Sequence, residues 1–291
     1  MKSNKNSLSF WLFLAPTLIA LFFVVCLPLI YGIYYSFTDW NGIGGIGSAT
    51  IIGFENYTKL FKDDVFLNSL WFTTKFSVVA IIFINVIGLG LALVVTSKIK
   101  SKNLLRTVFF MPNLIGGLIL GFIWQFIFIK AFAAIGSLFG IEALQAWLST
   151  PTTSFWGLVI LMSWQMSGYI MVIYVAYLEN VPQDMVEAAE IDGASAWQRF
   201  RHIVFPLVAP AFTVSLFLTL SNSFKLYDQN LSLTGGGPYN STQMVAMNIY
   251  KTAFSENLMA YAQAKAVIFF IIVAAIALTQ VYFNKKREVE M

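Results

Sequence analysis

The chain has 291 residues, of which 58% are hydrophobic and only 11% are charged. A typical soluble domain is about 45–50% apolar and about 25% charged. This composition therefore excludes an ordinary cytosolic enzyme and a disordered chain, and it suits a lipid bilayer. The formal net charge of +4 is a small, scattered excess of Lys and Arg. It favours basic residues on the cytoplasmic side of a membrane protein and argues against nucleic-acid binding.

Stretches without Asp, Glu, Lys or Arg predict six membrane-spanning helices, because a helix needs roughly 20 mostly apolar residues to cross a bilayer. The charge-free stretches are 6–38, 76–97, 107–129, 143–178, 202–224 and 266–284, and the spans expected around them are residues 10–35, 69–97, 107–129, 155–178, 204–224 and 264–284. Another charge-free stretch, 229–250, is excluded because the glycines and proline of Thr234–Pro238 would leave backbone groups that lipid cannot satisfy. We expect an all-α polytopic membrane protein with a single transmembrane domain over residues 1–291.

The distribution of Lys and Arg orients these spans. With the N-terminus inside, the inner segments hold 11 of the 18 basic residues, and four of them lie between Lys98 and Arg106. The first span follows Lys2 and Lys5 but is too long for a signal peptide and has no small-residue cleavage pattern. We expect an uncleaved first span and two cytoplasmic termini.

No residue pattern indicates that the chain could drive transport by itself. The six stretches contain no carboxylate of the kind that ion-coupled transporters place in the membrane. The absence of a Gly-Lys dipeptide excludes a Walker A loop. The single histidine, His202, cannot build a His-based metal site, and no cysteine cluster replaces it. We therefore expect neither catalysis nor a metal nor a bound cofactor in this chain.

The loop expected between the fourth and fifth spans, residues 179–203, carries the most information. Pro182 suits the first turn of a short helix, and Gly193 can take the left-handed conformation that ends it. Ser195 and Gln198 have the spacing of a capping box, which predicts a second helix. An ordinary surface connector and a docking element for another protein both fit this pattern.

The same loop resembles a known family. Glu187-Ala188-Ala189, Gly193 and Phe205-Pro206 have the spacing of the "EAA" loop of binding-protein-dependent ABC importer permeases, which usually end it with Leu-Pro. The resemblance implies the type I ABC importer transmembrane-subunit fold. It also implies a coupling helix that docks into a cleft of a cytoplasmic ATPase. Carried over by position, the contact residues are Glu187, Ala188, Ala189, Asp192 and Gly193.

Two outer segments resemble the carbohydrate-uptake subgroup of these permeases, which is maltose-type and closer to the raffinose or multiple-sugar permeases. They are Leu233–Pro238, followed by Ser241-Thr242, and Ile52–Tyr57. The implied partners are a second homologous permease subunit, two ATPase subunits that bind ATP and Mg, and an extracytoplasmic sugar-binding protein, all at a bacterial cell membrane. The alternative is a stand-alone facilitator or ion-coupled secondary transporter, which would move sugar without ATP.

Polar clusters within the fourth and fifth expected spans indicate a substrate pathway, because such side chains usually face the interior of a bundle. The candidates are Trp164, Gly168, Tyr169, Thr219, Asn222 and Ser223. Hydrogen bonding between helices, and close packing at Gly168, would also explain any single one of them. Resemblance to the maltose-type family supports a sugar site at these two clusters. Asn85 and Asn113 are weaker candidates.

Overall fold

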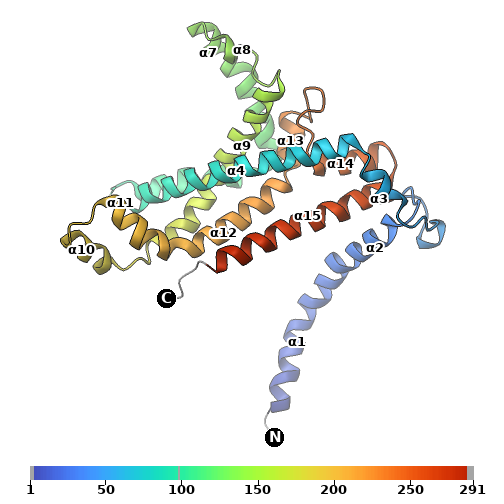
Figure 1. Ribbon diagram of the computed structural model, residues 1–291, viewed down its shortest axis with the longest axis horizontal. Coiled ribbons are helices and arrows are strands. Elements are labelled where there is room, and N and C mark those ends of the chain that lie inside the picture. The colour runs from blue at the N-terminus through green and yellow to red at the C-terminus, as the bar shows by residue number, and fades with distance from the viewer. Residues whose placement is uncertain (1–2, 98, 287–291) are drawn as a thin grey trace. The chain divides into compact units, whose positions relative to one another are not determined.

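The computed structural model describes residues 3–97 and 99–286 (Figure 1). Within these residues no strand forms, and the one extended pairing is an isolated antiparallel bridge between Thr38 and Ile51. The α-helices are α1 (Ser3–Leu21), α2 (Leu27–Ser36), α3 (Glu55–Leu60), α4 (Asp64–Thr96), α5 (Lys102–Phe110), α6 (Gly117–Phe126), α7 (Phe132–Phe139), α8 (Glu142–Gln145), α9 (Pro151–Leu178), α10 (Gln183–Ile191), α11 (Ala196–Arg199), α12 (Phe205–Phe224), α13 (Asp228–Leu233), α14 (Val245–Tyr250) and α15 (Met259–Lys285).

Short turns of other helix types lie between several of these helices. Wider, π-helical turns are η1 (Phe22–Cys26), η4 (Ile127–Ala131), η5 (Phe200–Val204) and η6 (Lys251–Ser255), and tighter 3₁₀ turns are η2 (Ile46–Ser48) and η3 (Met111–Leu114). η1 and η5 each precede a proline, Pro28 and Pro206, which cannot donate to the carbonyl one turn earlier. The helix widens there and continues rather than ending.

Six continuous helical segments among the described residues are long and apolar enough to cross a membrane. They are Phe10–Ser36, Asp64–Thr96, Gly117–Phe139, Pro151–Leu178, Ala196–Phe224 and Met259–Lys285. The expected all-α class with six membrane helices is confirmed. The excluded stretch 229–250 holds only the short helices α13 and α14, joined by a turn.

The third membrane helix begins ten residues later than the expected start at residue 107. Residues 107–114 belong to α5 and η3, and Ile115 is extended, which separates them from α6. Pro112 lacks the N–H that a continuing helix needs, so the helix breaks at this point. The same helix then runs past Lys130 to Phe139, so one lysine is tolerated within an otherwise apolar helix.

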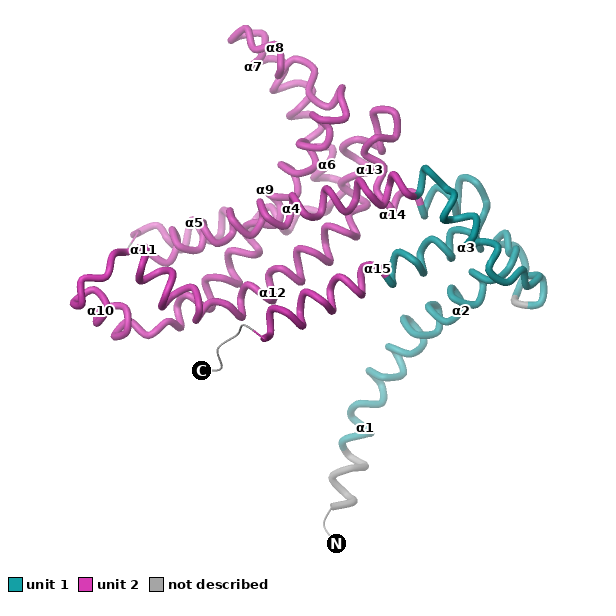
Figure 2. The backbone as a smooth tube through the Cα atoms, viewed as in Figure 1, with its two compact units in different colours: residues 1–66, 249–271 teal, residues 67–248, 272–291 magenta. Residues whose placement is uncertain are grey.

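The chain packs as two compact units (Figure 2). Unit 1 comprises Met1–Phe66 and Ile249–Ile271, and unit 2 comprises Leu67–Asn248 and Ile272–Met291.

Unit 1 contains a buried ion pair. Lys265 is 2% exposed, and its Nζ lies 2.8 Å from Oδ2 of Asp63 and 2.9 Å from Oγ1 of Thr252. The hydroxyl of Tyr261 donates to the same Asp63 oxygen at 2.8 Å. Burial raises the pKa of Asp63, but the hydrogen bonds from Lys265, the Phe66 amide and Tyr261 outweigh it and lower the pKa below its ordinary value.

Helix α9 lies at the centre of unit 2, since 72% of its most apolar window is buried, whereas none of the corresponding window of Phe10–Ser36 is. Its start is set locally: Thr150 and Thr153 form a reciprocal capping box, and Pro151 occupies the first turn. Helices α5 and α12 and the turn η3 pack against it. The core cluster around α9 includes Phe76, Leu158, Ile170 and Tyr174, which are all buried.

Candidate functional site

A polar cavity of about 450 Å³ lies in unit 2 between α9, α12, α13 and the turn η3. Its walls are formed by Asn113, Met162, Gln165, Met166, Tyr169, Leu218, Asn222, Lys225, Leu226 and Gln229. The lining combines amides, a phenol and one ammonium group with the apolar surfaces of methionine and leucine. It has no carboxylate.

Two glutamines form one wall of this cavity. Nε2 of Gln229 donates to Oε1 of Gln165 at 2.8 Å, and Nε2 of Gln165 donates to the carbonyl of Ile115 at 3.3 Å. These bonds connect α13, α9 and the link after η3. The amide groups thus hold their positions before any ligand enters.

Two of the expected substrate residues line the cavity. Tyr169 on α9 is half-buried, and no hydrogen bond holds its hydroxyl within the described residues. Asn222 on α12 is exposed to the cavity, and its Nδ2 donates to the carbonyl of Leu218 at 2.8 Å. The carbonyl oxygen of its amide remains available to a ligand.

Trp164 and Gly168 lie on a different side of α9, in a groove of about 670 Å³ with a mostly apolar lining. Trp164 makes an edge-to-face contact with Trp124, with ring centroids 5.6 Å apart. Gly168 packs against the backbone of Phe109, where a Cβ would come much closer than 3.0 Å to the carbonyl group. The structure does not bring these two residues to the polar cavity.

Thr219 and Ser223 are fully buried in α12 and donate to carbonyls of their own helix, those of Ser215 and Thr219, at 2.7 Å each. Nδ2 of Asn85 donates to Oγ1 of Thr219 at 3.1 Å, and the hydroxyl of Tyr174 donates to Oδ1 of Asn85 at 2.9 Å. These bonds form a polar network that joins α4, α12 and α9. Thr219 and Ser223 therefore lie outside the cavity wall.

Gln165, Gln229 and Lys225 line the cavity but were not among the expected substrate residues. A helical projection at 100° per residue was available as a signal. It places positions 162, 165, 166 and 169 on one face of α9 and position 164 about 140° from position 169. For Gln229 no such signal existed, because α13 is too short to show a period.

The loop between α9 and α12 forms the expected helix–turn–helix. Helix α10 ends in a Schellman motif: the amide of Ala194 donates to the carbonyl of Ala189 at 2.9 Å, and that of Gly193 to Glu190 at 3.1 Å. Gly193 has φ +82°, the left-handed conformation that favours glycine. Ser195 and Gln198 form the capping box that starts α11, so the predicted local structure of this loop is confirmed.

The family-derived contact residues lie on the surface of this loop. Glu187, Ala188, Asp192 and Gly193 are exposed, and Ala189 is half-buried. Nearby, Ile191 is 86% exposed and Trp197 is 65% exposed. Large exposed apolar side chains beside charged ones mark protein-interaction surfaces when they lie outside the bilayer.

Six described helices long enough to cross a membrane, a polar cavity among them and an ordered loop with exposed apolar side chains are features that a membrane transport permease requires. Residues 84–289 match the family of binding-protein-dependent transport system inner membrane components, and the chain belongs to this family.

Two relatives align over nearly their whole length. The chain is 60% identical over 290 residues to the probable starch degradation products transport system permease protein AmyD of Thermoanaerobacterium thermosulfurigenes, covering 100% of this chain and 98% of the relative. It is 32% identical to the multiple sugar-binding transport system permease protein MsmF of Streptococcus mutans, covering 96% of each.

A solved structure shares the fold. A chain of a bacterial ABC transporter that imports the acidic polysaccharide alginate superposes with a TM-score of 0.84 at 19% identity, covering 98% of each chain.

Proposed function

We propose that this chain is one transmembrane subunit of an ATP-driven importer that takes up a sugar, specifically a starch-derived oligosaccharide. The polar cavity carries the proposal. It places several amide groups and a tyrosine ring inside an otherwise apolar helical protein, and its volume falls within the range of small-molecule sites. The relatives named for starch degradation products and multiple sugars support this substrate class over a raffinose-type one.

The cavity suits a neutral sugar. The ring of Tyr169 offers an aromatic face for stacking, and the amides of Asn113, Gln165, Asn222 and Gln229 offer both donors and acceptors to hydroxyl groups. Met162 and Met166 give an adaptable apolar surface for the faces of the sugar ring. The lining therefore matches a ligand that is polar at its edges and apolar on its faces.

Coupling to an energy source would occur through Glu187, Ala188, Ala189, Asp192 and Gly193. The exposed Ile191 and Trp197 support a docking surface here, because water-exposed residues of this size favour burial against another protein. The proposed partners are two ATPase subunits that bind ATP and Mg, a second homologous permease and an extracytoplasmic sugar-binding protein. This chain itself would perform no catalysis. The loop and both termini would then be cytoplasmic in a bacterial cell membrane.

Transport assays in proteoliposomes test this function. The permease pair, the ATPases and the binding protein are reconstituted, and uptake of maltotriose, maltotetraose and raffinose is measured with and without ATP. We expect ATP-dependent uptake of the maltooligosaccharides. Uptake by this chain alone without ATP would instead establish the stand-alone transporter.

Variants locate the substrate site in the same assay. We expect Tyr169→Ala and Asn222→Ala to raise the KM for sugar uptake about tenfold or more, the effect of one or two lost ligand contacts of about 1.4 kcal/mol each. Trp164→Phe, in the apolar groove, is the matched control and leaves the KM unchanged. An unchanged KM in both alanine variants would exclude this cavity as the sugar site.

A further inference from the structure

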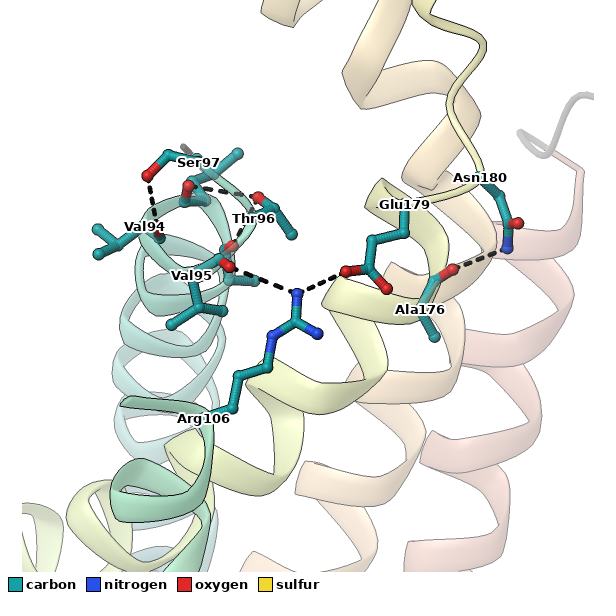
Figure 3. A network of polar contacts seen from close by, with 10 residues as sticks. Val94, Val95, Thr96, Ser97, Arg106, Ala176, Glu179 and Asn180 are labelled. Atoms are coloured by element: carbon teal, nitrogen blue, oxygen red, sulfur yellow. Dashed lines mark hydrogen bonds and ion pairs between the residues drawn. The ribbon is translucent and has the colours of Figure 1, made fainter. Parts of the chain in front are cut away.

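Helix α5 is held against α9 at two points. Near the C-terminal end of α5, the backbone of Phe109 approaches Gly168 so closely that no side chain fits between them. One turn earlier, Nη2 of Arg106 forms an ion pair with Oε1 of Glu179 at 2.5 Å (Figure 3). We call these two contacts the α5 clamp.

Arg106 also reaches a third helix. Its Nη2 donates to the carbonyl of Val95 in the last turn of α4 at 3.4 Å, as Figure 3 shows. Its Nε is buried without a hydrogen-bond partner among the described residues. Val95 and Glu179 therefore supply the polar contacts that fix the guanidinium group, and Arg106 connects the ends of α4 and α9.

The position of Glu179 gives this contact its importance. Glu179 is the C-cap of α9 and the first residue of the loop 179–203. Gly168 lies eleven residues earlier, about 16 Å along a continuous helix without an intervening proline. The clamp thus holds the C-terminal part of α9 against α5. This part of α9 extends from Gly168, next to the cavity residue Tyr169, to Glu179 at the start of the loop.

In the rest of the loop, polar contacts join its two helices to each other, while Val181 and Val186 pack against the hydrophobic core of unit 2. Nη1 of Arg199 donates to the carbonyl of Ala194 at 2.8 Å, and Nη2 of Arg199 lies 3.9 Å from Oε2 of Glu190. These contacts keep α10 and α11 together as one piece. The ion pair between Arg106 and Glu179 connects the start of the loop to α5.

We propose that Arg106 is a positioning residue for energy coupling, which makes α9, α5 and the end of α4 move together when the loop 179–203 is displaced. The inference rests on the proposed function, because it requires an ATPase that moves the loop. Without the ion pair, only apolar packing would hold the start of the loop, and it would move more freely relative to α5. ATP hydrolysis would then continue while less of each displacement reached the cavity.

The ion pair contributes little to folding. The side chains of Arg106 and Glu179 are 25% and 50% exposed, and solvent screens a pair at that exposure. Its loss should therefore leave the protein folded and inserted. The ratio of sugar transported to ATP hydrolysed separates a coupling role from a merely structural one, because a smaller folded fraction lowers both rates equally.

The test uses the complete transporter in proteoliposomes with maltotriose. It compares Arg106→Gln, Glu179→Gln, the exchanged pair Arg106→Glu/Glu179→Arg, and Lys102→Gln, which removes an exposed charge from the same helix. We expect each single variant to lower the transport-to-hydrolysis ratio about two- to fivefold, the range that a partly exposed ion pair supports. The exchanged pair restores the ion pair but not the donation to Val95, so it should recover part of that loss, and Lys102→Gln should match the wild type.

Each other outcome overturns the inference. An unchanged ratio in Arg106→Gln and Glu179→Gln, an equal decrease in Lys102→Gln, or no recovery in the exchanged pair would show that the pair does not position the loop. If the wild-type complex itself shows no ATP-dependent uptake, the proposed function fails as well. Normal wild-type uptake with unchanged variants refutes only the role of Arg106.

Discussion

Gly168→Ala adds only one methyl group, but we expect it to destabilise unit 2 strongly. The added Cβ would lie much closer than 3.0 Å to the carbonyl carbon and oxygen of Phe109 and 3.0 Å from Cα of Phe110. All three atoms belong to the backbone, so no side chain can rotate away. Contacts of this type need about 3.5–4.0 Å, and α5 would have to move away from α9. Overpacking of this kind costs about 1–3 kcal/mol.

Two other glycines provide matched controls. At Gly90, on α4, nothing lies within 4 Å of the position that an added methyl group would take, so Gly90→Ala should be neutral or slightly stabilising through helix propensity. At Gly121 the closest atom is the hydroxyl oxygen of Ser232, which can rotate away, but Cβ of Ser232 at 2.9 Å and the carbonyl oxygen of Gln229 at 3.2 Å move only with the backbone. Its alanine variant should fall between the other two.

Thermal unfolding of the detergent-solubilised complex measures this order. The midpoint should be lowest for Gly168→Ala, intermediate for Gly121→Ala and near the wild type for Gly90→Ala. Gly168→Ala with the stability of Gly90→Ala would refute the close approach of α5 and α9. It would also return Gly168 to consideration as a substrate contact.

Three other predictions concern buried bonds and the loop. Tyr174→Phe should cost about 1–3 kcal/mol of unfolding free energy in the same assay, because it leaves Oδ1 of Asn85 buried without its donor; an unchanged midpoint would contradict this. The lowered pKa of Asp63 stabilises the fold above the ordinary carboxyl pKa of 3.8, and protonation removes that contribution only as pH falls below it. Unfolding midpoints of the wild type and the double variant Asp63→Asn/Lys265→Met, which leaves no buried ammonium without its counter-ion, should therefore differ by a constant amount between pH 5 and 7, and convergence at pH 5 would count against it. Gly193→Asp should abolish uptake, because it strains a turn with φ +82° and adds a charge to the proposed docking surface. The subunit should still insert, because the turn is exposed. Retained uptake would exclude coupling through this loop.

The sequence was sufficient for the class of fold, the number of spans and the local structure of the loop. Each of these depends on signals along the chain: charge-free stretches, Gly193 at a helix end, and the Ser195–Gln198 spacing. The bounds of the third span could not be found from charge alone. Pro112 broke the helix within an apolar stretch, and Lys130 was tolerated within the helix that followed, so charge exclusion misplaced both ends of this helix.

Some of the expected substrate residues line the cavity and others do not, and the sequence of a single helix cannot distinguish the two groups. Tyr169 and Asn222 line the cavity because α9 and α12 turn those faces toward α13 and η3. Thr219 is also polar, but its hydroxyl oxygen accepts a hydrogen bond from Asn85 on α4. Polarity in a membrane helix predicts an interior position, and only the packing of neighbouring helices decides whether the interior partner is a cavity or another side chain.

The two helices that flank the loop also form two walls of the cavity, through Tyr169 on α9 and Asn222 on α12. Beside the cavity, Asn85 bonds to both helices: to Tyr174, which lies between Tyr169 and the loop on α9, and to Thr219, which lies at the level of the cavity residues Leu218 and Asn222 on α12. Because these hydrogen bonds lie in a low-dielectric interior, breaking them without replacement is costly. A displacement of the loop is therefore easier to accommodate by tilting α9 and α12 about this network than by separating them there. Under the proposed coupling, such tilting would change the distance between those parts of the two cavity walls that lie away from Thr219, so movement at the loop would alter the cavity without any contact between the two sites.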